Sequence, residues 1–285
     1  DPEQVVIGDG ATGVIMQVLR AVTTPGDTMV MATPTFDGFP IFAHMARLRS
    51  VTVPLDAHGH HDLDAMAEAV TCCSSERSSA AHARVVVVCR PHNPTGTVET
   101  VEDLERFLAR VPEDTVVLLD EAYVEFLAPE HRIDATALVD RFGNVVVVRT
   151  FSKAYGLAGL RVGYGFCAAD VGRLLWTMQL PFGVSQPALV AVAASYGSES
   201  QLQQRIRMIS AERRHLQLRL RAMGLYTTDA HANFVYLPGA EGSWREVFDG
   251  TGPQVRHYSG GGVRITVGSR ASTRAVVRTV GAAMR

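Results

Sequence analysis

The chain has 285 residues, of which 47% are hydrophobic and 20% charged, and its formal net charge is −2. A chain of this length can bury a large core, and one large domain with a smaller one is the expected organisation. The near-neutral charge provides no global field that would attract nucleic acid or anionic membranes, so we expect neither partner. No uninterrupted apolar run approaches membrane-spanning length.

The cysteine content and the start of the chain both bear on its origin. Four cysteines occur without CxxC spacing, and the sequence shows no secretory leader. Both features favour a reducing cytoplasm and reduced thiols. The chain runs almost at once into an expected core element without an initiator Met, which indicates a fragment or a chain lacking upstream residues.

A glycine-rich segment, residues 8–13, lies between an expected strand at 5–7 and an expected helix at 14–22. It matches the G-x-G-x-x-G pattern of dinucleotide-binding proteins. That pattern also requires an acidic residue at the end of the second strand, whereas the second strand here, residues 28–32, ends in Thr33. An oxidoreductase using this segment therefore ranks last among the functions considered.

The glycine segment can also be interpreted more generally, as a phosphate-binding helix N-terminus. Gly10, Ala11 and Thr12 at a helix N-terminus offer backbone N–H groups and a positive dipole end to a phosphate. A tight turn into a helix explains the segment about equally well. In the turn-rich connection that follows the second strand, Phe36 could stack on a planar ligand, although a Phe after a proline is usually part of the core.

A polar connection follows an expected helix at residues 41–48 and an expected strand at 50–55. Catalytic metal sites usually need ligands on rigid elements with supporting hydrogen bonds, and this segment only precedes a helix. We therefore interpret it as a solvated loop with an aspartate N-cap, and we predict no metal site. A Ser/Ala-rich stretch at residues 72–83 predicts a loose connector. The polar connection contains three histidines among three carboxylates: Asp56, His58, His60, His61, Asp62 and Asp64.

From residue 85 onward, apolar β-branched runs at 85–89, 115–119 and 144–148 alternate with helical segments. Such alternation predicts an α/β fold with a mainly parallel sheet covered by helices on both faces. Ligands in such sheets bind beyond the carboxyl ends of the strands. The sequence therefore predicts a ligand site at this edge, built from polar residues that follow the strands: Asn93, Asp120, Tyr123, Thr150, Ser152 and Lys153.

Lys153 is the candidate nucleophile of this site. It lies just past a buried strand beside Phe151, and partial desolvation favours its neutral, nucleophilic amine. Around it, Thr150, Ser152 and Arg161 could hold a phosphate through hydroxyl and guanidinium contacts. A nucleophilic lysine beside a phosphate cradle suggests covalent binding of pyridoxal phosphate. The alternative for this stretch alone is a surface loop with an ordinary solvated lysine.

Each part of pyridoxal phosphate makes a demand on the protein. The pyridine nitrogen needs a buried carboxylate, and Asp120 ends an apolar strand. The ring oxygen needs hydrogen-bond donors, for which Asn93 and Tyr123 lie on neighbouring strand ends, and Phe36 could stack on the ring. An amino-acid substrate needs an arginine for its carboxylate, and Arg264 in an apolar strand is hard to explain otherwise.

The C-terminal part predicts a small α+β domain. An arginine-rich helix at residues 201–223 could face nucleic acid, but without net basicity or interleaved aromatic residues a solvated helix face is favoured. Short strands at 233–237 and 263–267 and a final helix from residue 273 complete this domain. We therefore expect a large ligand-binding domain at residues 1–190 and a small domain at residues 191–285.

With these residues in place, the sequence resembles the fold-type I pyridoxal-phosphate-dependent aminotransferases. Within them it is similar to the histidinol-phosphate aminotransferase group, including its aromatic (phenylalanine) branch. The resemblance implies the fold-type I large domain, a smaller C-terminal domain and a homodimer. It rests on segments spread in family order over most of the chain: residues 93–96, 120–125, 149–161, 232–234 and 263–267.

The resemblance also implies roles for single residues. Lys153 would bind the cofactor covalently and then move a proton between the substrate and the cofactor. Asp120 would bind the pyridine nitrogen, and Asn93 and Tyr123 the ring oxygen, with Lys153, Asp120 and Tyr123 as the catalytic set. The remaining assignments are the phosphate contacts Thr150, Ser152 and Arg161, the substrate-carboxylate ligand Arg264, and the further substrate contacts Arg256 and Asn233.

The expected reaction is amino transfer from an aromatic or imidazolyl donor, phenylalanine-like or histidinol phosphate, to 2-oxoglutarate. Residues 8–13 lack the acidic pair that histidinol-phosphate enzymes usually carry after this turn, which favours aromatic donors. Two alternatives remain: a pyridoxal-phosphate-dependent decarboxylase resembling the threonine-phosphate enzymes, and a non-catalytic domain that kept the fold.

Overall fold

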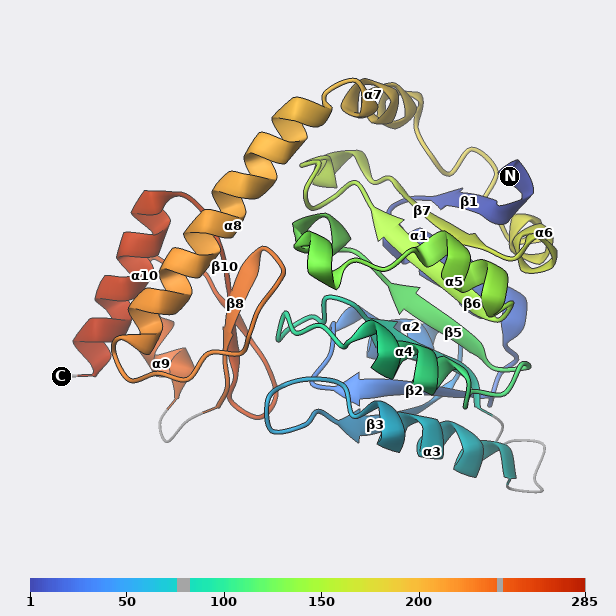
Figure 1. The fold of residues 1–285 in the computed structure, drawn as a ribbon, viewed down its shortest axis with the longest axis horizontal. Helices are drawn as coiled ribbons and strands as arrows, with labels where there is room; N and C mark the ends of the chain where they lie inside the picture. Colours follow the sequence, from blue (N-terminus) through green and yellow to red (C-terminus); the bar gives the residue numbers. More distant parts are fainter. Residues whose placement is uncertain (76–82, 240–242, 285) are drawn as a thin grey trace.

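Two β-sheets organise the chain in the computed structural model, which describes residues 1–75, 83–239 and 243–284 (Figure 1). The small sheet consists of β8 (Phe234–Leu237), β9 (Arg256–His257) and β10 (Val263–Thr266) in the order β8-β10-β9. The large sheet has the order β1-β7-β6-β5-β4-β2-β3. Its strands are β1 (Val5–Gly8), β2 (Thr28–Thr33), β3 (Arg49–Pro54), β4 (Ala83–Cys89), β5 (Val116–Asp120), β6 (Val145–Thr150) and β7 (Gly163–Cys167).

The large sheet is mainly parallel, which confirms the predicted α/β fold. Strands β3, β2, β4, β5 and β6 pair in parallel, and β7 runs antiparallel between β6 and β1. The sheet places β1 at its edge, a position that does not fit the central first strand of a dinucleotide-binding fold. The oxidoreductase alternative is therefore unsupported by the topology.

Helices cover both faces of this sheet (Figure 1). On one face lie α3 (Leu63–Ser75), α4 (Val101–Leu108) and α5 (Ala135–Arg141), whose apolar residues form one core with the strands. A second core, on the other face, includes α1 (Ala11–Val22), α2 (Gly38–Met45) and α6 (Ala169–Thr177). Burial on both sides explains why the strand sequences are continuous aliphatic runs rather than alternating ones.

Strand β7 was not predicted, because its glycines interrupt the apolar pattern. A Cβ atom at Gly163 would collide with the backbone of Ala11, and one at Gly165 would lie 2.9 Å from Cγ1 of Val14. The glycines therefore let α1 lie directly on β7. Successive side chains alternate across a strand, so Tyr164 points to the opposite face.

The small sheet packs with α8 (Glu199–Arg221), α9 (Trp244–Phe248) and α10 (Arg270–Ala283) around a third core. Helix α7 (Gln186–Tyr196) precedes α8 and leads from the large sheet to this second unit (Figure 1). The expected domain boundary at residues 190 and 191 falls inside α7 and stays a prediction. Within the described ranges, no helix is long and apolar enough to cross a bilayer.

Most element boundaries differ from expectation by one to three residues. Helix α2 begins at Gly38 rather than residue 41, since Pro40 lies in its first turn, where a missing N–H costs little. Strand β6 continues to Thr150, two residues beyond the expected end. In the predicted connector at 72–83, residues 72–75 instead belong to the end of α3, and residues 76–82 lie outside the described residues.

The histidine-rich connection is partly buried, which corrects its interpretation as a solvated loop. The side chain of Asp62 caps α3 as predicted, accepting a hydrogen bond from the N–H of Ala65 at 2.9 Å. His61, however, is buried, with Nδ1 2.7 Å from Oε1 of Glu99 and its ring packed on that of His92. Burial lowers the pKa of His92 to about 3, so His92 is neutral. These contacts fix the loop between β4 and α4.

Candidate active site

The carboxyl ends of β4, β5 and β6 meet at one edge of the large sheet. Asp120, the last residue of β5, pairs in register with Cys89 on β4 and Val148 on β6. Beyond these strand ends lies a cavity of about 180 Å³. Its lining consists of Ala11, Thr12, Ile15, Phe36, Asn93, Asp120, Ala122, Tyr123, Thr150, Ser152, Lys153, Ala158 and Arg161.

Lys153 is half-buried in this cavity, and its Nζ lies 5.4 Å from the centroid of the Tyr123 ring. Burial and the nearby Arg264 guanidinium lower the pKa of Lys153, while Asp120 acts in the opposite direction. A lowered pKa favours the neutral amine that attacks a carbonyl carbon. Lys153 is also the only lysine in the whole sequence, a signal that sequence analysis missed.

Asp120 is a buried carboxylate whose hydrogen-bond donors are both neutral. Its Oδ1 accepts from the N–H of Ala122 at 2.9 Å, and the Cys89 thiol lies 3.8 Å from Oδ2. Burial raises the pKa of Asp120 to about 6, against the opposing effects of these donors and of Lys153. A buried carboxylate of this kind gains most from a cationic partner placed in the cavity.

Another part of the cavity lining carries groups that suit an anion. Gly10 caps the N-terminus of α1 with a φ of 82°, and a Cβ atom there would collide with the guanidinium of Arg161. That guanidinium lies 3.4 Å from the hydroxyl groups of Thr12 and Ser152. Backbone N–H groups, two hydroxyls and an arginine at a helix N-terminus form a phosphate-binding arrangement.

The small sheet contributes a cation beside the cavity. Arg264 on β10 donates from Nη1 to Oδ1 of Asn93 at 2.7 Å, and its guanidinium lies over the ring of Phe234. Arg256 is placed differently, since its Nε lies 2.9 Å from Oδ2 of Asp37 in an ion pair. Asn233 is not among the cavity-lining residues, and its described contact is through the backbone carbonyl, which accepts from Val267.

The structure thus gathers most of the predicted residues and adds two that sequence analysis missed. Cys89 reaches Asp120 through strand register, and no sequence pattern reveals register. Tyr258 donates to Oδ1 of Asn93 at 3.2 Å, and its position before a glycine run was the available signal. Phe36 lines the cavity, as its expected stacking role requires, while packing on Phe39.

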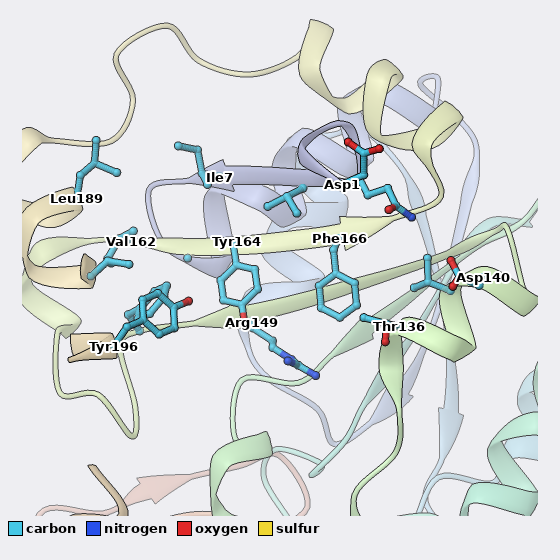
Figure 2. Close-up of a pocket in the computed structure, with 16 residues that line it drawn as sticks. Asp1, Ile7, Thr136, Asp140, Arg149, Val162, Tyr164, Phe166, Leu189 and Tyr196 are labelled. Carbon is cyan, nitrogen blue, oxygen red and sulfur yellow. The ribbon is translucent and has the colours of Figure 1, made fainter. Parts of the chain in front are cut away.

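A larger hollow of about 540 Å³ lies on the face of β7 away from α1 (Figure 2). Tyr164 and Phe166 extend into it side by side from β7, with Tyr196 at one end. Its arginine, Arg149, is paired with the buried carboxylate of Glu121 at 2.7 Å. The described residues that line this hollow include no lysine, histidine or cysteine, so we assign the chemistry to the smaller cavity.

The smaller cavity fits pyridoxal phosphate part by part. The neutral-donor environment of Asp120 suits a protonated ring nitrogen, and the absence of a side chain at Gly10 lets the Arg161 guanidinium approach the helix N-terminus where a phosphate would bind. Lys153 supplies the amine for the aldehyde. When bound, pyridoxal phosphate supplies an electron sink for the bonds at the substrate α-carbon. Fold and site together define a pyridoxal-phosphate-dependent enzyme of fold type I.

Comparisons with known proteins give the family. The family model described as "Aminotransferase class I and II" matches residues 1–280. The aromatic amino acid aminotransferase of Streptomyces avermitilis is 43% identical over 263 residues, which are 92% of this chain and 71% of that protein. The corresponding protein of Cutibacterium acnes is 36% identical over 287 residues, covering 100% of this chain and 79% of that protein.

A solved structure agrees with this result. Histidinol-phosphate aminotransferase from Sinorhizobium meliloti, in complex with pyridoxal-5'-phosphate, matches with a TM-score of 0.89 at 26% identity, covering 100% of this chain and 77% of that one. The chain therefore belongs to the class I and II aminotransferase family. It is a pyridoxal-phosphate-dependent transaminase, which confirms the predicted resemblance, fold class, enzyme class and cofactor.

Proposed function

We propose that this aminotransferase takes its amino group from an aromatic amino acid and passes it to 2-oxoglutarate. One observation carries the proposal: the only lysine of the chain lies in one cavity with Asp120 and a phosphate-binding helix end, beside Arg264. Arg264 is the guanidinium that would clamp the α-carboxylate of either substrate, because it reaches the cavity edge at Asn93. The curated relatives named above carry the aromatic name, which supports this choice.

In this proposal the residues act on specific atoms of the cofactor and the substrate. Lys153 Nζ would hold the cofactor through its aldehyde, and its free amine would move a proton to and from the substrate α-carbon. Asp120 would keep the ring nitrogen protonated, while Asn93 and Tyr123 would donate to the ring oxygen. The phosphate would be held by Thr12, Thr150, Ser152 and Arg161 and by the backbone at Gly10 and Ala11, and Phe36 would lie against the ring.

The Arg256–Asp37 ion pair favours an uncharged aromatic side chain over histidinol phosphate. Because the positive charge of Arg256 is matched by Asp37 at 2.9 Å, a substrate phosphate arriving there would also meet a carboxylate. An uncharged aromatic ring would not be repelled by this carboxylate. Arg256 is therefore proposed as the weaker of two anion contacts, after Arg264, and Asn233 as a neighbouring substrate contact.

Replacing Asp37 with asparagine should shift the preference toward anionic donors. A half-exposed ion pair is worth about 0.2–1 kcal/mol. We therefore expect the kcat/KM ratio of histidinol phosphate to phenylalanine to rise about 1.5- to 5-fold. Steady-state kinetics with both donors measures this ratio. Asp170→Asn, which removes a carboxylate paired with Arg173 on the surface, is the matched control, and an unchanged ratio in Asp37→Asn would contradict the assignment.

A half-reaction tests the proposed function. The cofactor-loaded protein is mixed with L-phenylalanine, without any oxo acid, and the cofactor absorbance and the released products are measured. We expect phenylpyruvate in amounts matching the cofactor, and faster conversion than with histidinol phosphate. Release of carbon dioxide would instead indicate the decarboxylase alternative, and an unchanged spectrum with both donors would refute aromatic or imidazolyl amino transfer.

We further propose that a second copy of the chain covers a hollow beside the phosphate-binding end that is lined by both polar and exposed apolar side chains. This hollow, about 320 Å³ in volume, is lined by Thr12 and Gly13 together with Met45, Met178 and Leu180. The last three are exposed hydrophobic side chains, a pattern that marks interaction surfaces. The proposed dimer would therefore adjoin the active site of each copy.

Substituting Leu180 with glutamate should dissociate this dimer. Burying a leucine stabilises by about 1.5–3 kcal/mol, and a two-fold interface contains it twice, so we expect the dimer dissociation constant to rise at least about 100-fold. Light scattering coupled to gel filtration measures the mass. Leu218→Glu, on an exposed face of α8, is the control. A monomeric parent protein, or a Leu180→Glu protein that stays dimeric, would contradict the proposal.

Two further expectations remain proposals. The division into domains at residues 1–190 and 191–285 follows the separation of the two sheets, with α7 between them. A cytoplasmic location rests on the cysteine content, and two of the cysteines, Cys89 and Cys167, are buried thiols.

A further inference from the structure

Tyr258 lies where the small sheet meets the cofactor cavity. It follows β9, and its N–H donates to the carbonyl of Gly262 at 2.9 Å, closing a tight turn into β10. Gly260 and Gly261 in this turn have φ values of 89° and 82°, a region that favours glycine. The turn directs the buried Tyr258 side chain away from solvent, toward the large sheet.

Two donors from the small sheet converge on one atom of Asn93. The hydroxyl of Tyr258 donates to Oδ1 at 3.2 Å, and Nη1 of Arg264 donates to the same atom at 2.7 Å. An arginine has no acceptor, so the amide atom facing it must be the oxygen rather than the nitrogen. This orientation leaves Nδ2 of Asn93 to donate into the cavity that the residue lines.

We propose that Tyr258 is a positioning residue that holds the Asn93 amide with its NH₂ group toward the cofactor ring oxygen. The inference rests on the proposed role of Asn93 as a donor to that oxygen. It assigns a function to a residue of the small sheet that does not line the cavity.

Tyr258 is needed because the Asn93 amide and the substrate carboxylate compete for the Arg264 guanidinium. A substrate carboxylate forms a charge-assisted hydrogen bond with Arg264, which is stronger than the bond from Arg264 to a neutral amide oxygen. While substrate is bound, Tyr258 is then the donor that keeps the amide from turning over. Burial raises the pKa of Tyr258, so its hydroxyl keeps its proton across the working pH range.

Other contacts show that the loop of Asn93 is already attached to the C-terminal part of the chain. The hydroxyl of Thr228 donates to the carbonyl of Thr95 at 2.6 Å, and the N–H of His231 donates to the carbonyl of Gly96 at 2.7 Å. These bonds hold the backbone but leave the Asn93 side chain free to rotate. Loss of the Tyr258 hydroxyl should therefore change the amide orientation without releasing the loop.

The test is an absorbance titration of the cofactor-loaded protein with pH, because a donor to the ring oxygen stabilises its negative charge. All variants are titrated with 3-phenylpropionate, a carboxylate without an amine, so that Arg264 is occupied and Tyr258 is the remaining donor to Oδ1 of Asn93. Removing that donor should raise the pH at which the lysine-bound cofactor changes colour. Tyr258→Phe should shift this midpoint upward by roughly half to one pH unit, the equivalent of one hydrogen bond. Tyr236→Phe is the matched control, since its ring packs 6.2 Å from that of Tyr258 on the same sheet.

The Asn93→Ala variant distinguishes a failure of the Tyr258 inference from a failure of the proposed role of Asn93. We expect an upward shift in Asn93→Ala and in Tyr258→Phe, no shift in Tyr236→Phe, and the parent melting temperature in both phenylalanine variants. A shift in Asn93→Ala with a parental midpoint in Tyr258→Phe would overturn the inference alone. Equal shifts in both phenylalanine variants would also overturn it. No shift in Asn93→Ala would refute the proposed role of Asn93, and the inference with it.

Discussion

Replacing Lys153 with alanine should abolish amino transfer while leaving the fold intact. The side chain is half-buried at the edge of a cavity, so its loss removes little packing. Proton transfer by a positioned amine alone contributes about 10²- to 10⁴-fold to rate, and the covalent link to the cofactor is lost as well. Because the chain contains no other lysine, no second side-chain amine can substitute.

Steady-state turnover and the absorbance of the bound cofactor measure this effect together. The Lys153→Ala protein should retain the parent melting temperature and lose the lysine-linked absorbance. A small primary amine added to the solution should restore part of the activity, because it can enter the vacated space and carry the proton. Turnover near the parent level in Lys153→Ala would show that another group performs the proton transfer.

Asp120→Asn should lower activity and yet stabilise the protein when no cofactor is bound. In the loaded enzyme the substitution removes one partner of a buried charge pair, which costs about 2–5 kcal/mol, or about 30- to 5,000-fold in rate. Without cofactor, Asp120 is a buried carboxylate whose hydrogen-bond donors among the described residues are neutral. Removing that charge removes a desolvation penalty.

The raised pKa of Asp120 determines at which pH the Asp120→Asn substitution stabilises the cofactor-free protein. The pKa of Asp120 is raised by burial from 3.8 to about 6 in the folded protein, so folding favours the protonated form. Its stabilising contribution is complete below pH 3.8 and is lost as the pH rises to about 6, at a cost of roughly 3 kcal/mol.

Urea unfolding of the cofactor-free parent and Asp120→Asn proteins measures the difference in unfolding free energy. We expect equal stability below about pH 4 and a more stable Asp120→Asn protein above about pH 6. Because other carboxylates such as the half-buried Glu125 also titrate, the comparison uses the difference between the two proteins. A parent protein that is the more stable of the two above pH 6 would contradict the assigned burial of this charge.

Local patterns along the chain were sufficient to predict the sheet and the polar residues at its edge. Aliphatic runs that end in Asp120 or lead to Asn93 and Lys153 report burial and strand direction, and the carboxyl ends of parallel strands then coincide by topology. Segments that break the hydrophobic pattern were missed. Strand β7 is one example, because its glycines serve the close packing of α1.

Contacts between distant segments were also beyond sequence analysis. Arg256 was expected to meet an anionic substrate group, and nothing in its neighbourhood along the chain indicates its ion pair with Asp37. Burial of His61 was missed for the same reason, since its partner Glu99 is distant in sequence. Side-chain pairing across the fold depends on strand register and loop path, which local patterns do not specify.

Reductive trapping tests the central claim most directly. The cofactor-loaded protein is treated with borohydride, which makes the link between amine and pyridoxal phosphate permanent, and the digested peptides are mapped by mass spectrometry. We predict that the cofactor is found on the peptide containing Lys153, in proportion to the active protein. A protein that takes up no cofactor, or one labelled only at its N-terminal amine, would contradict the account.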